Sequence, residues 1–441
     1  MRSYRIVRIA GLHYERPKTE LYRGNPGLTS AAYCKQQKTL FENAYTYGDS
    51  FSRGMARLGH EAHEIVYDLE TMQKTWALEH GLPFGESCWS VEILLAQIRA
   101  LRPDVLFFQD IHSLPHAEMR SLKDAFPSVK LVVAFRGYPG LDAEAMRQLS
   151  VADVVLAGSP VVEEKCSSAG LAPRLVYHYF DDSILRKLSR RYGDEADGSY
   201  GYDFTFIGSS GFGYGTGHQS RYWLLANLLR STELRAWLDE RETRPRSTVG
   251  RIKGAGKVRL IRGLASLHPS LVSRSADLPG VPSRLADLIR ATGATRTGGP
   301  AVQALPSRVP MVPLGTVFRA RCSGSVFGLE MYKILRDSRV TLNKHSDVAA
   351  GTVDNIRLFQ ATGVGACLLT DAGSNMTELF TPDEEVVTYS SEEECVEKQR
   401  HLLGHEALRR QIAQAGQRRT LRDHTAASRC EQIDGIIQER L

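Results

Sequence analysis

The side chains best suited to chemistry stand close together after a strand predicted over residues 339–342. Lys344 and His345 follow that strand, and Arg357 lies in the first turn of a helix predicted over residues 355–361. The N-terminus of a helix presents free backbone N–H groups and the positive end of its dipole, which together attract anions. The three basic side chains add donors at the same place, so the pattern predicts a phosphate site.

A loop of small residues follows the next predicted strand, over residues 366–370. It carries Asp371, Ala372 and Gly373, whose backbone a sugar could approach. Ligands of open parallel sheets bind at the carboxyl ends of the strands, where both loops lie. A diphosphate that joins a sugar to a nucleoside would suit this pair of loops.

A glycine-dense loop follows the strand predicted over residues 203–207. It contains Gly208 and Ser209, and the segment after it carries His218 and Arg221. Glycines let the backbone approach a phosphate closely. The G-x-G-x-x-G and G-K-S/T spacings are missing, which argues against an NAD site and a P-loop. Two interpretations stay open: the first strand–loop–helix unit of a nucleotide-binding domain, or a plain surface loop.

Three side chains in the first half of the chain could act as a base. Asp49 precedes a predicted helix, so it is either a base or a helix cap. Asp110 and His112 follow a strand predicted over residues 104–108. His112 could act in a cleft with Asp110 orienting it, or it could serve packing alone. Four further residues could either line the cleft or serve only the structure: Tyr47, Gln73, Trp76 and Arg136.

Short apolar runs alternate with helix-length amphipathic stretches, which predicts parallel sheets covered on both faces. The expected fold class is α/β, with two Rossmann-like domains facing a cleft. The first domain is expected over residues 1–187, a charged and glycine-bearing linker over 188–201, and the second domain over 202–420. Residues 421–441 are expected as a C-terminal helix that packs back on the first domain.

The second domain is expected to hold a basic insertion at about residues 235–320. Between Arg241 and Arg296 stand twelve Lys or Arg residues and three acids. Leucines at near-helical spacing among these charges fit a basic amphipathic element that contacts an anionic membrane or a lipid phosphate. A solvated helical insertion with ordinary exposed arginines is the alternative.

The composition is that of an ordinary globular chain of 441 residues, with 42% hydrophobic residues and a net charge of +6. Arginines interrupt the apolar residues at the N-terminus, and no apolar run is long enough to span a bilayer. The seven cysteines form no C-x-x-C pair, so we expect neither disulfides nor a structural zinc. We expect a cytoplasmic protein, or one on the inner face of the membrane, without a nucleic-acid partner.

The segment from Ser325 onward resembles bacterial group-1-like glycosyltransferases of the spore-maturation type. The matching runs are NIRLFQATGVGA at residues 355–366, LLTD at 368–371 and ELF at 378–380. The resemblance implies the GT-B fold, a nucleotide-sugar held by the C-terminal domain and no bound metal; the chain has no D-x-D motif. It places Phe327 near the nucleobase and Asn355 and Arg357 near the diphosphate. Gln360 stands where these families have a glutamate that bonds the ribose, and Thr352 where retaining relatives have another acid.

The function expected from this resemblance is a hexosyltransferase-like glycosyltransferase in surface polysaccharide or glycoconjugate synthesis. Its co-substrate would be a nucleotide-diphosphate sugar, UDP-linked in preference to GDP- or TDP-linked, and its acceptor a glycan, a lipid-linked sugar or a protein. Two alternatives stay open. Gln360 and the missing acid motivate a degenerate binding or assembly protein. Another two-domain sugar-nucleotide enzyme, such as an epimerase, would share the fold.

Overall fold

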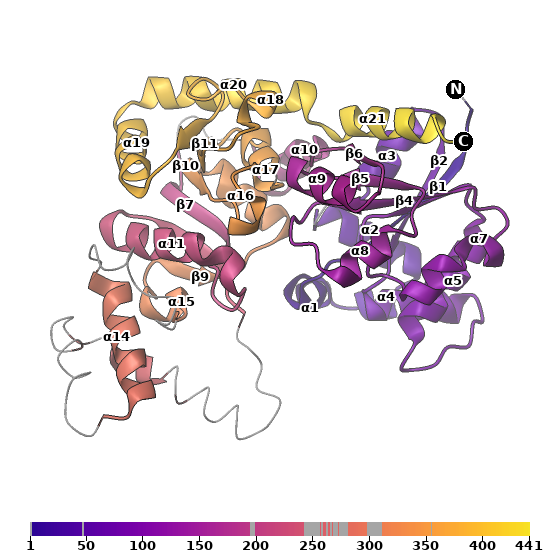
Figure 1. The fold of residues 1–441 in the computed structure, drawn as a ribbon, viewed down its shortest axis with the longest axis horizontal. Coiled ribbons are helices and arrows are strands. Elements are labelled where there is room, and N and C mark those ends of the chain that lie inside the picture. Colours follow the sequence, from indigo (N-terminus) through magenta and orange to yellow (C-terminus); the bar gives the residue numbers. More distant parts are fainter. Residues whose placement is uncertain are drawn as a thin grey trace.

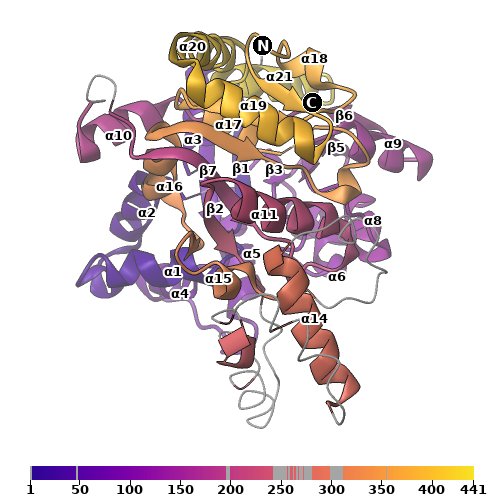
Figure 2. The ribbon, with the colours of Figure 1, turned by 90° about the vertical axis from the view of Figure 1, so that its left-hand side faces the viewer.

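The computed structural model describes most of the chain. The described residues are 2–45, 48–194, 199–241, 256, 259–261, 263–264, 267, 272, 281–297, 311–353 and 355–441. About half of the expected basic insertion, together with Tyr47, lies outside them. Its described part includes helix α14 (Ser283–Thr297), which projects away from both sheets in Figure 2.

The N-terminal half forms a six-stranded sheet in the order β2-β1-β3-β4-β5-β6, with every neighbouring pair parallel. Its strands are β1 (Arg5–Ala10), β2 (Glu61–Val66), β3 (Val105–Phe108), β4 (Leu131–Arg136), β5 (Val154–Ala157) and β6 (Pro173–Leu175). Every residue of β3 and β5 is buried. This burial explains their continuous apolar sequence, because helices cover both faces of the sheet.

The connections of this half are mostly helical. They are α1 (Glu15–Arg23), η1 (Leu28–Ser30), α2 (Tyr33–Glu42), α3 (Ser50–Arg57), α4 (Glu70–Glu79), α5 (Trp89–Leu101), α6 (His116–Arg120), α7 (Leu122–Ala125), α8 (Ala143–Leu149), α9 (Pro160–Ser168) and α10 (Ser183–Tyr192). Helix α10 leaves the first sheet and packs on the second, where Ile184 and Leu188 are buried in its core. Residues 188–192, expected to open the linker, are therefore helical.

The second sheet has the order β12-β11-β10-β7-β8-β9, again with parallel neighbours only. Its strands are β7 (Tyr202–Ser209), β8 (Arg235–Asp239), β9 (Cys322–Gly324), β10 (Ser338–Asn343), β11 (Cys367–Asp371) and β12 (Val387–Tyr389). The remaining helices are η2 (Thr216–His218), α11 (Gln219–Ser231), α15 (Leu314–Val317), α16 (Gly328–Arg336), η4 (Asp347–Ala349), α17 (Arg357–Gly363), α18 (Met376–Leu379), α19 (Glu392–Gly404), α20 (Glu406–Asp423) and α21 (Ala426–Gln438). The expected pair of Rossmann-like domains is thereby confirmed.

The chain returns to the first domain at its C-terminal end. Helix α20 covers the second domain, and α21 lies along the first beside both termini (Figure 1). Cys430, Ile433 and Ile437 of α21 are buried in one core with strands of the first sheet. The hydroxyl of Tyr4 donates to Asp434 over 2.7 Å. The first domain is thus completed by the last helix of the chain.

No helix of the described residues is both long and apolar enough to cross a bilayer.

Candidate functional site

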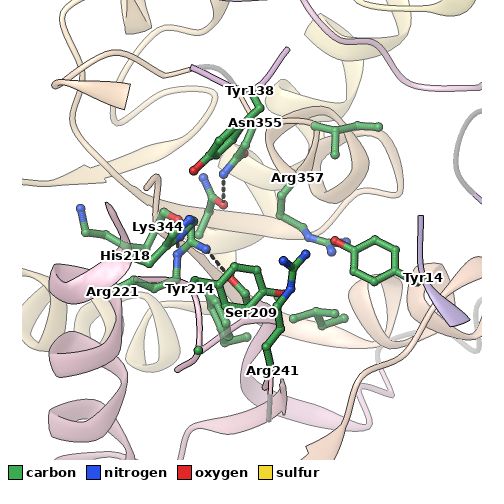
Figure 3. Close-up of a pocket in the computed structure, with 16 residues that line it drawn as sticks. Tyr14, Tyr138, Ser209, Tyr214, His218, Arg221, Arg241, Lys344, Asn355 and Arg357 are labelled. Carbon is green, nitrogen blue, oxygen red and sulfur yellow. Dashed lines mark hydrogen bonds between the residues drawn. The ribbon is translucent and has the colours of Figure 1, made fainter. Parts of the chain in front are cut away.

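A cavity of about 570 Å³ opens where the carboxyl ends of β7 and β10 face the first domain. Tyr14 and Tyr138 of the first domain close one side, and the second domain supplies the other walls (Figure 3). We call this cavity the phosphate cleft. The described lining contains five basic side chains and no Asp or Glu; the five are His218, Arg221, Arg241, Lys344 and Arg357.

Two of these arginines are desolvated and form no ion pair among the described residues, although more distant carboxylates offset part of the charge of Arg221. Arg357 has no carboxylate within ion-pair distance among the described residues, and its Nη1 donates only to the sulfur of Met331, 2.9 Å away. Desolvation lowers the pKa of Arg357 to about 10. Arg221 donates to the neutral oxygens of Lys344 (backbone, 3.0 Å) and Ser209 (2.6 Å), and burial lowers its pKa too. A cation desolvated without a counter-charge favours an incoming anion.

The third arginine, Arg241, lies 4.3 Å from the ring centroid of Tyr214, and its guanidinium is directed into the same cavity as that of Arg357 (Figure 3). The hydroxyl of Tyr214 donates to Asp239, which fixes the ring. The loop that brings these groups together requires glycine at position 213. Gly213 has φ +80°, and a Cβ there would lie 2.0 Å from the Arg241 carbonyl oxygen.

A second cavity of about 780 Å³ adjoins the phosphate cleft on the side of the first domain. We call it the acceptor cleft. It lies at the carboxyl ends of β1, β3 and β4 and shares Tyr14, Tyr138 and Arg241 with the phosphate cleft. Asp110 and His112 line it, so the structure brings two of the three candidate bases to one cavity.

Asp110 is the sole acidic side chain among the described residues that line the acceptor cleft. One carboxylate oxygen accepts from the Tyr67 hydroxyl at 2.5 Å and lies 3.6 Å from Nδ1 of His13. The other accepts from the backbone N–H of His112 at 2.9 Å. Asp110 therefore positions the Tyr67 hydroxyl and faces the ring of His13, while its bond to His112 involves the backbone alone.

The two clefts share walls from both domains, and the comparisons with known proteins fit that arrangement. Residues 295–435 match the family model described as glycosyl transferase-like. No curated protein matches the sequence. The Anabaena HepE protein, crystallised in complex with UDP and glucose, aligns over 99% of this chain and 100% of its own, with a TM-score of 0.53 and 11% identity. The chain has the GT-B fold.

Two further GT-B structures support that assignment. Sucrose-phosphate synthase from Thermosynechococcus elongatus aligns over 99% of both chains, with a TM-score of 0.51 and 12% identity. A glycosyltransferase from Rickettsia africae covers 100% of this chain and 99% of its own, with a TM-score of 0.50 and 10% identity. At such identities the likeness concerns the fold alone.

In this GT-B chain, three of the predicted donor residues face a different cavity. His345, Asp371 and Ala372 line a pocket of about 750 Å³ between α11 and the ends of β10 to β12, and Lys344 lines both cavities. Nδ1 of His345 lies 2.8 Å and Nζ of Lys344 2.9 Å from the Asp371 carboxylate. These two partners hold the pKa of Asp371 well below its usual range, despite burial.

Other predicted donor residues have structural neighbours as well. Gln360 is buried and donates to the Tyr332 hydroxyl at 3.1 Å, without lining the phosphate cleft. The Phe327 ring packs 4.9 Å from that of Tyr14 in the first domain. Gly373 is pressed against Val353, where a Cβ would meet a methyl group at 2.6 Å. Seven of the predicted donor residues do line the phosphate cleft: Gly208, Ser209, His218, Arg221, Lys344, Asn355 and Arg357.

The helix expected to begin at Asn355 begins at Arg357 instead. Asn355 lies before it, accepts from the backbone N–H of Leu358 at 3.3 Å and donates to the side chain of Asn343 at 2.8 Å. These bonds hold its carboxamide at the junction of the two clefts.

The third candidate base lies elsewhere. Asp49 occupies the position before α3 without a side-chain cap bond, and its carboxylate pairs with Arg53 at 3.1 Å. Of the four further residues, Arg136 lines the acceptor cleft, whereas Gln73 donates to the Val66 backbone and Trp76 stacks on His80.

Sequence reasoning missed His13, Tyr14 and Tyr138. All three follow strands at the edge where ligands of parallel sheets bind, so the rule applied to the second domain could have found them in the first. The described residues contain no group of three His, Cys, Asp or Glu side chains able to hold a metal ion.

Proposed function

We propose that this protein is a glycosyltransferase that moves a sugar from a nucleotide-diphosphate sugar to an acceptor hydroxyl. The observation that carries the proposal is the phosphate cleft, where three arginines meet without an acidic lining residue among those described. A diphosphate would supply the missing negative charge. The glycosyl transferase-like match of residues 295–435 supports the same class of reaction.

The chemistry needs stabilisation of a leaving diphosphate. As the bond between the anomeric carbon and the phosphate oxygen breaks, negative charge grows on the departing group. Arg221 and Arg357 are already desolvated and fixed, so they stabilise that charge with little reorganisation. In this proposal they replace a bound metal ion.

The acceptor hydroxyl would enter from the acceptor cleft. His13, with Asp110 3.6 Å from its Nδ1, is the proposed base. The hydroxyl oxygen bonds to the anomeric carbon, its proton passes to the imidazole, and the diphosphate leaves. The Asp110 carboxylate would stabilise the resulting imidazolium.

UDP is the proposed nucleotide, because the HepE structure that aligns over the full chain was crystallised with UDP and glucose. We place the reaction in surface polysaccharide or glycoconjugate synthesis, as in the spore-maturation-type family that the C-terminal segment resembles. Peripheral membrane contact through residues 241–296 is part of the proposal.

Thermal unfolding with UDP, GDP, TDP, CMP and NAD tests the nucleotide site, and hydrolysis of UDP-glucose tests the chemistry. We expect UDP to raise the unfolding temperature of the wild type. At a hundredfold excess of UDP over its Kd, the free energy of unfolding should increase by about 2.7 kcal/mol. Stabilisation by NAD alone would exclude the proposal. UDP binding without release of UDP from any UDP-sugar would favour a degenerate binding protein.

A further inference from the structure

Arg136 stands at the end of β4 in the acceptor cleft with most of its hydrogen-bonding capacity unused. Its Nε donates to the Tyr138 backbone oxygen at 3.0 Å and its Nη2 to the Gly140 backbone oxygen at 2.6 Å. A guanidinium has five N–H donors, so three of them have no partner among the described residues. The two carbonyls fix the group in position without neutralising it.

No ion pair neutralises Arg136 among the described residues, although Asp142 and Asp110 lie near enough to offset part of its charge. Among the described residues no carboxylate lies within ion-pair distance of it, and desolvation lowers its pKa. Asp110, the acidic residue of this cleft, is engaged by Tyr67 and faces His13. Of the three arginines in the described lining, Arg221 and Arg241 also line the phosphate cleft, so Arg136 is the one that lines the acceptor cleft alone.

The position of Arg136 separates it from the proposed donor site. It lines the acceptor cleft but not the phosphate cleft, whose diphosphate would be held by Arg221, Arg241 and Arg357. The cavity of about 780 Å³ is large enough for a saccharide beside the nucleotide-sugar. A ligand reaching from His13 to Arg136 would span the carboxyl ends of β1, β3 and β4.

We propose that the acceptor is a carbohydrate that carries an oxyanion, a phosphate or a carboxylate, and that Arg136 binds this group while the acceptor hydroxyl faces His13 and Asp110. The inference rests on the proposed function and names its acceptor class. A planar guanidinium with free N–H groups on one edge matches the two oxygens of such an anion.

Calorimetric titrations of the purified protein, with and without saturating UDP and at low ionic strength, test the proposal. The probes are glucose 6-phosphate, glucuronate, glucose and farnesyl phosphate. We expect at least one charged sugar to bind about tenfold more tightly than glucose. Arg136→Gln should remove that advantage and leave the Kd for glucose and UDP unchanged, whereas Arg136→Lys should retain part of it.

Arg147→Gln is the matched control, since this arginine is exposed on α8 and pairs with Glu144. It should change none of the affinities. Equal binding of glucose and the charged sugars would overturn the proposal, as would an Arg136→Gln variant that loses neutral and charged sugars alike, because Arg136 would then only clamp its loop. Arg136-dependent binding of farnesyl phosphate alone would overturn it in favour of a lipid phosphate.

Failure of this inference is distinguishable from failure of the proposed function. If UDP does not bind the wild type, the donor site is wrong, yet the titrations without UDP still decide whether Arg136 selects charged sugars.

Discussion

Tyr138 of the first domain and His218 of the second face each other with parallel rings, their centroids 6.4 Å apart and their planes inclined by 3°. Both side chains line both clefts. The pair therefore joins the two domains at the point where donor and acceptor would meet.

Removing the Tyr138 ring should impair closure of the cleft. Aromatic pairs contribute about 0.5–1.5 kcal/mol beyond area burial, so Tyr138→Ala should lower kcat/KM by roughly two- to tenfold. Tyr138→Phe keeps the ring and should behave as wild type. Initial rates of UDP release over a range of UDP-sugar concentrations measure this. A Phe variant as impaired as the Ala variant would assign the effect to the hydroxyl instead.

Arg357→Met should separate stability from binding. The substitution removes a desolvated charge that has no carboxylate partner, so the free energy of unfolding should stay constant or rise by about 1 kcal/mol. The stabilisation of the protein by UDP should disappear, because the cleft loses a phosphate contact. Urea unfolding with and without UDP gives both quantities. A destabilised variant that still responds to UDP would show that Arg357 serves packing.

Asp110→Asn and His13→Gln should slow the chemical step while leaving UDP affinity unchanged. General-base assistance contributes about 10²–10⁴-fold to a rate, and the loss should appear in kcat. Asp124→Asn, on the exposed face of α7, is the matched control. An unchanged kcat in both cleft variants would remove the proposed base.

Acid should loosen the junction between the domains through His424. Burial lowers the pKa of His424 to about 4, and its ring bonds the Leu379 carbonyl oxygen at 2.9 Å and Arg429 at 2.9 Å. In the unfolded chain the His424 ring takes up a proton near pH 6.5, whereas in the folded chain it does so only near pH 4. The contribution of His424 to stability is therefore complete above pH 6.5 and falls towards pH 4, with a loss of about 2–3 kcal/mol at pH 4.5.

Urea unfolding between pH 7.5 and 4.5 measures that loss. His424→Gln removes the titrating group and should flatten the pH dependence by about the same amount, whatever its effect at pH 7.5. An unchanged slope would mean that other groups govern acid sensitivity.

The architecture could be predicted because its signals are local. Continuous apolar runs such as those of β3 and β5 are explained by burial on both faces of a parallel sheet. More of the second domain could be predicted from the sequence, since the segment around Arg357 resembles a known family. Its loops follow strands, and the carboxyl-end rule placed Ser209, Lys344 and Arg357 at one edge.

The partners of the side chains within the site could not be predicted from the sequence, because they depend on contacts between distant segments. Asp371 contacts the side chains of both Lys344 and His345, which a sequence shows only as three polar residues in two loops. Gln360 faces Tyr332, 28 positions away, and the pairing of His13 with Asp110 spans about a hundred residues. Such partners are set by the order of strands in the sheet, and spacing along the chain does not encode it.

The packing of helix α21 on the first domain affects how the chain folds while it is being synthesised. Its buried residues share a core with Tyr4, Phe51 and Met55, all within the first 55 residues. A ribosome releases those early segments long before it releases α21, so an apolar face of the first sheet stays uncovered while the whole second domain emerges. The nascent chain would then depend on a chaperone, or on temporary cover from its own later segments, until the last helix closes that face.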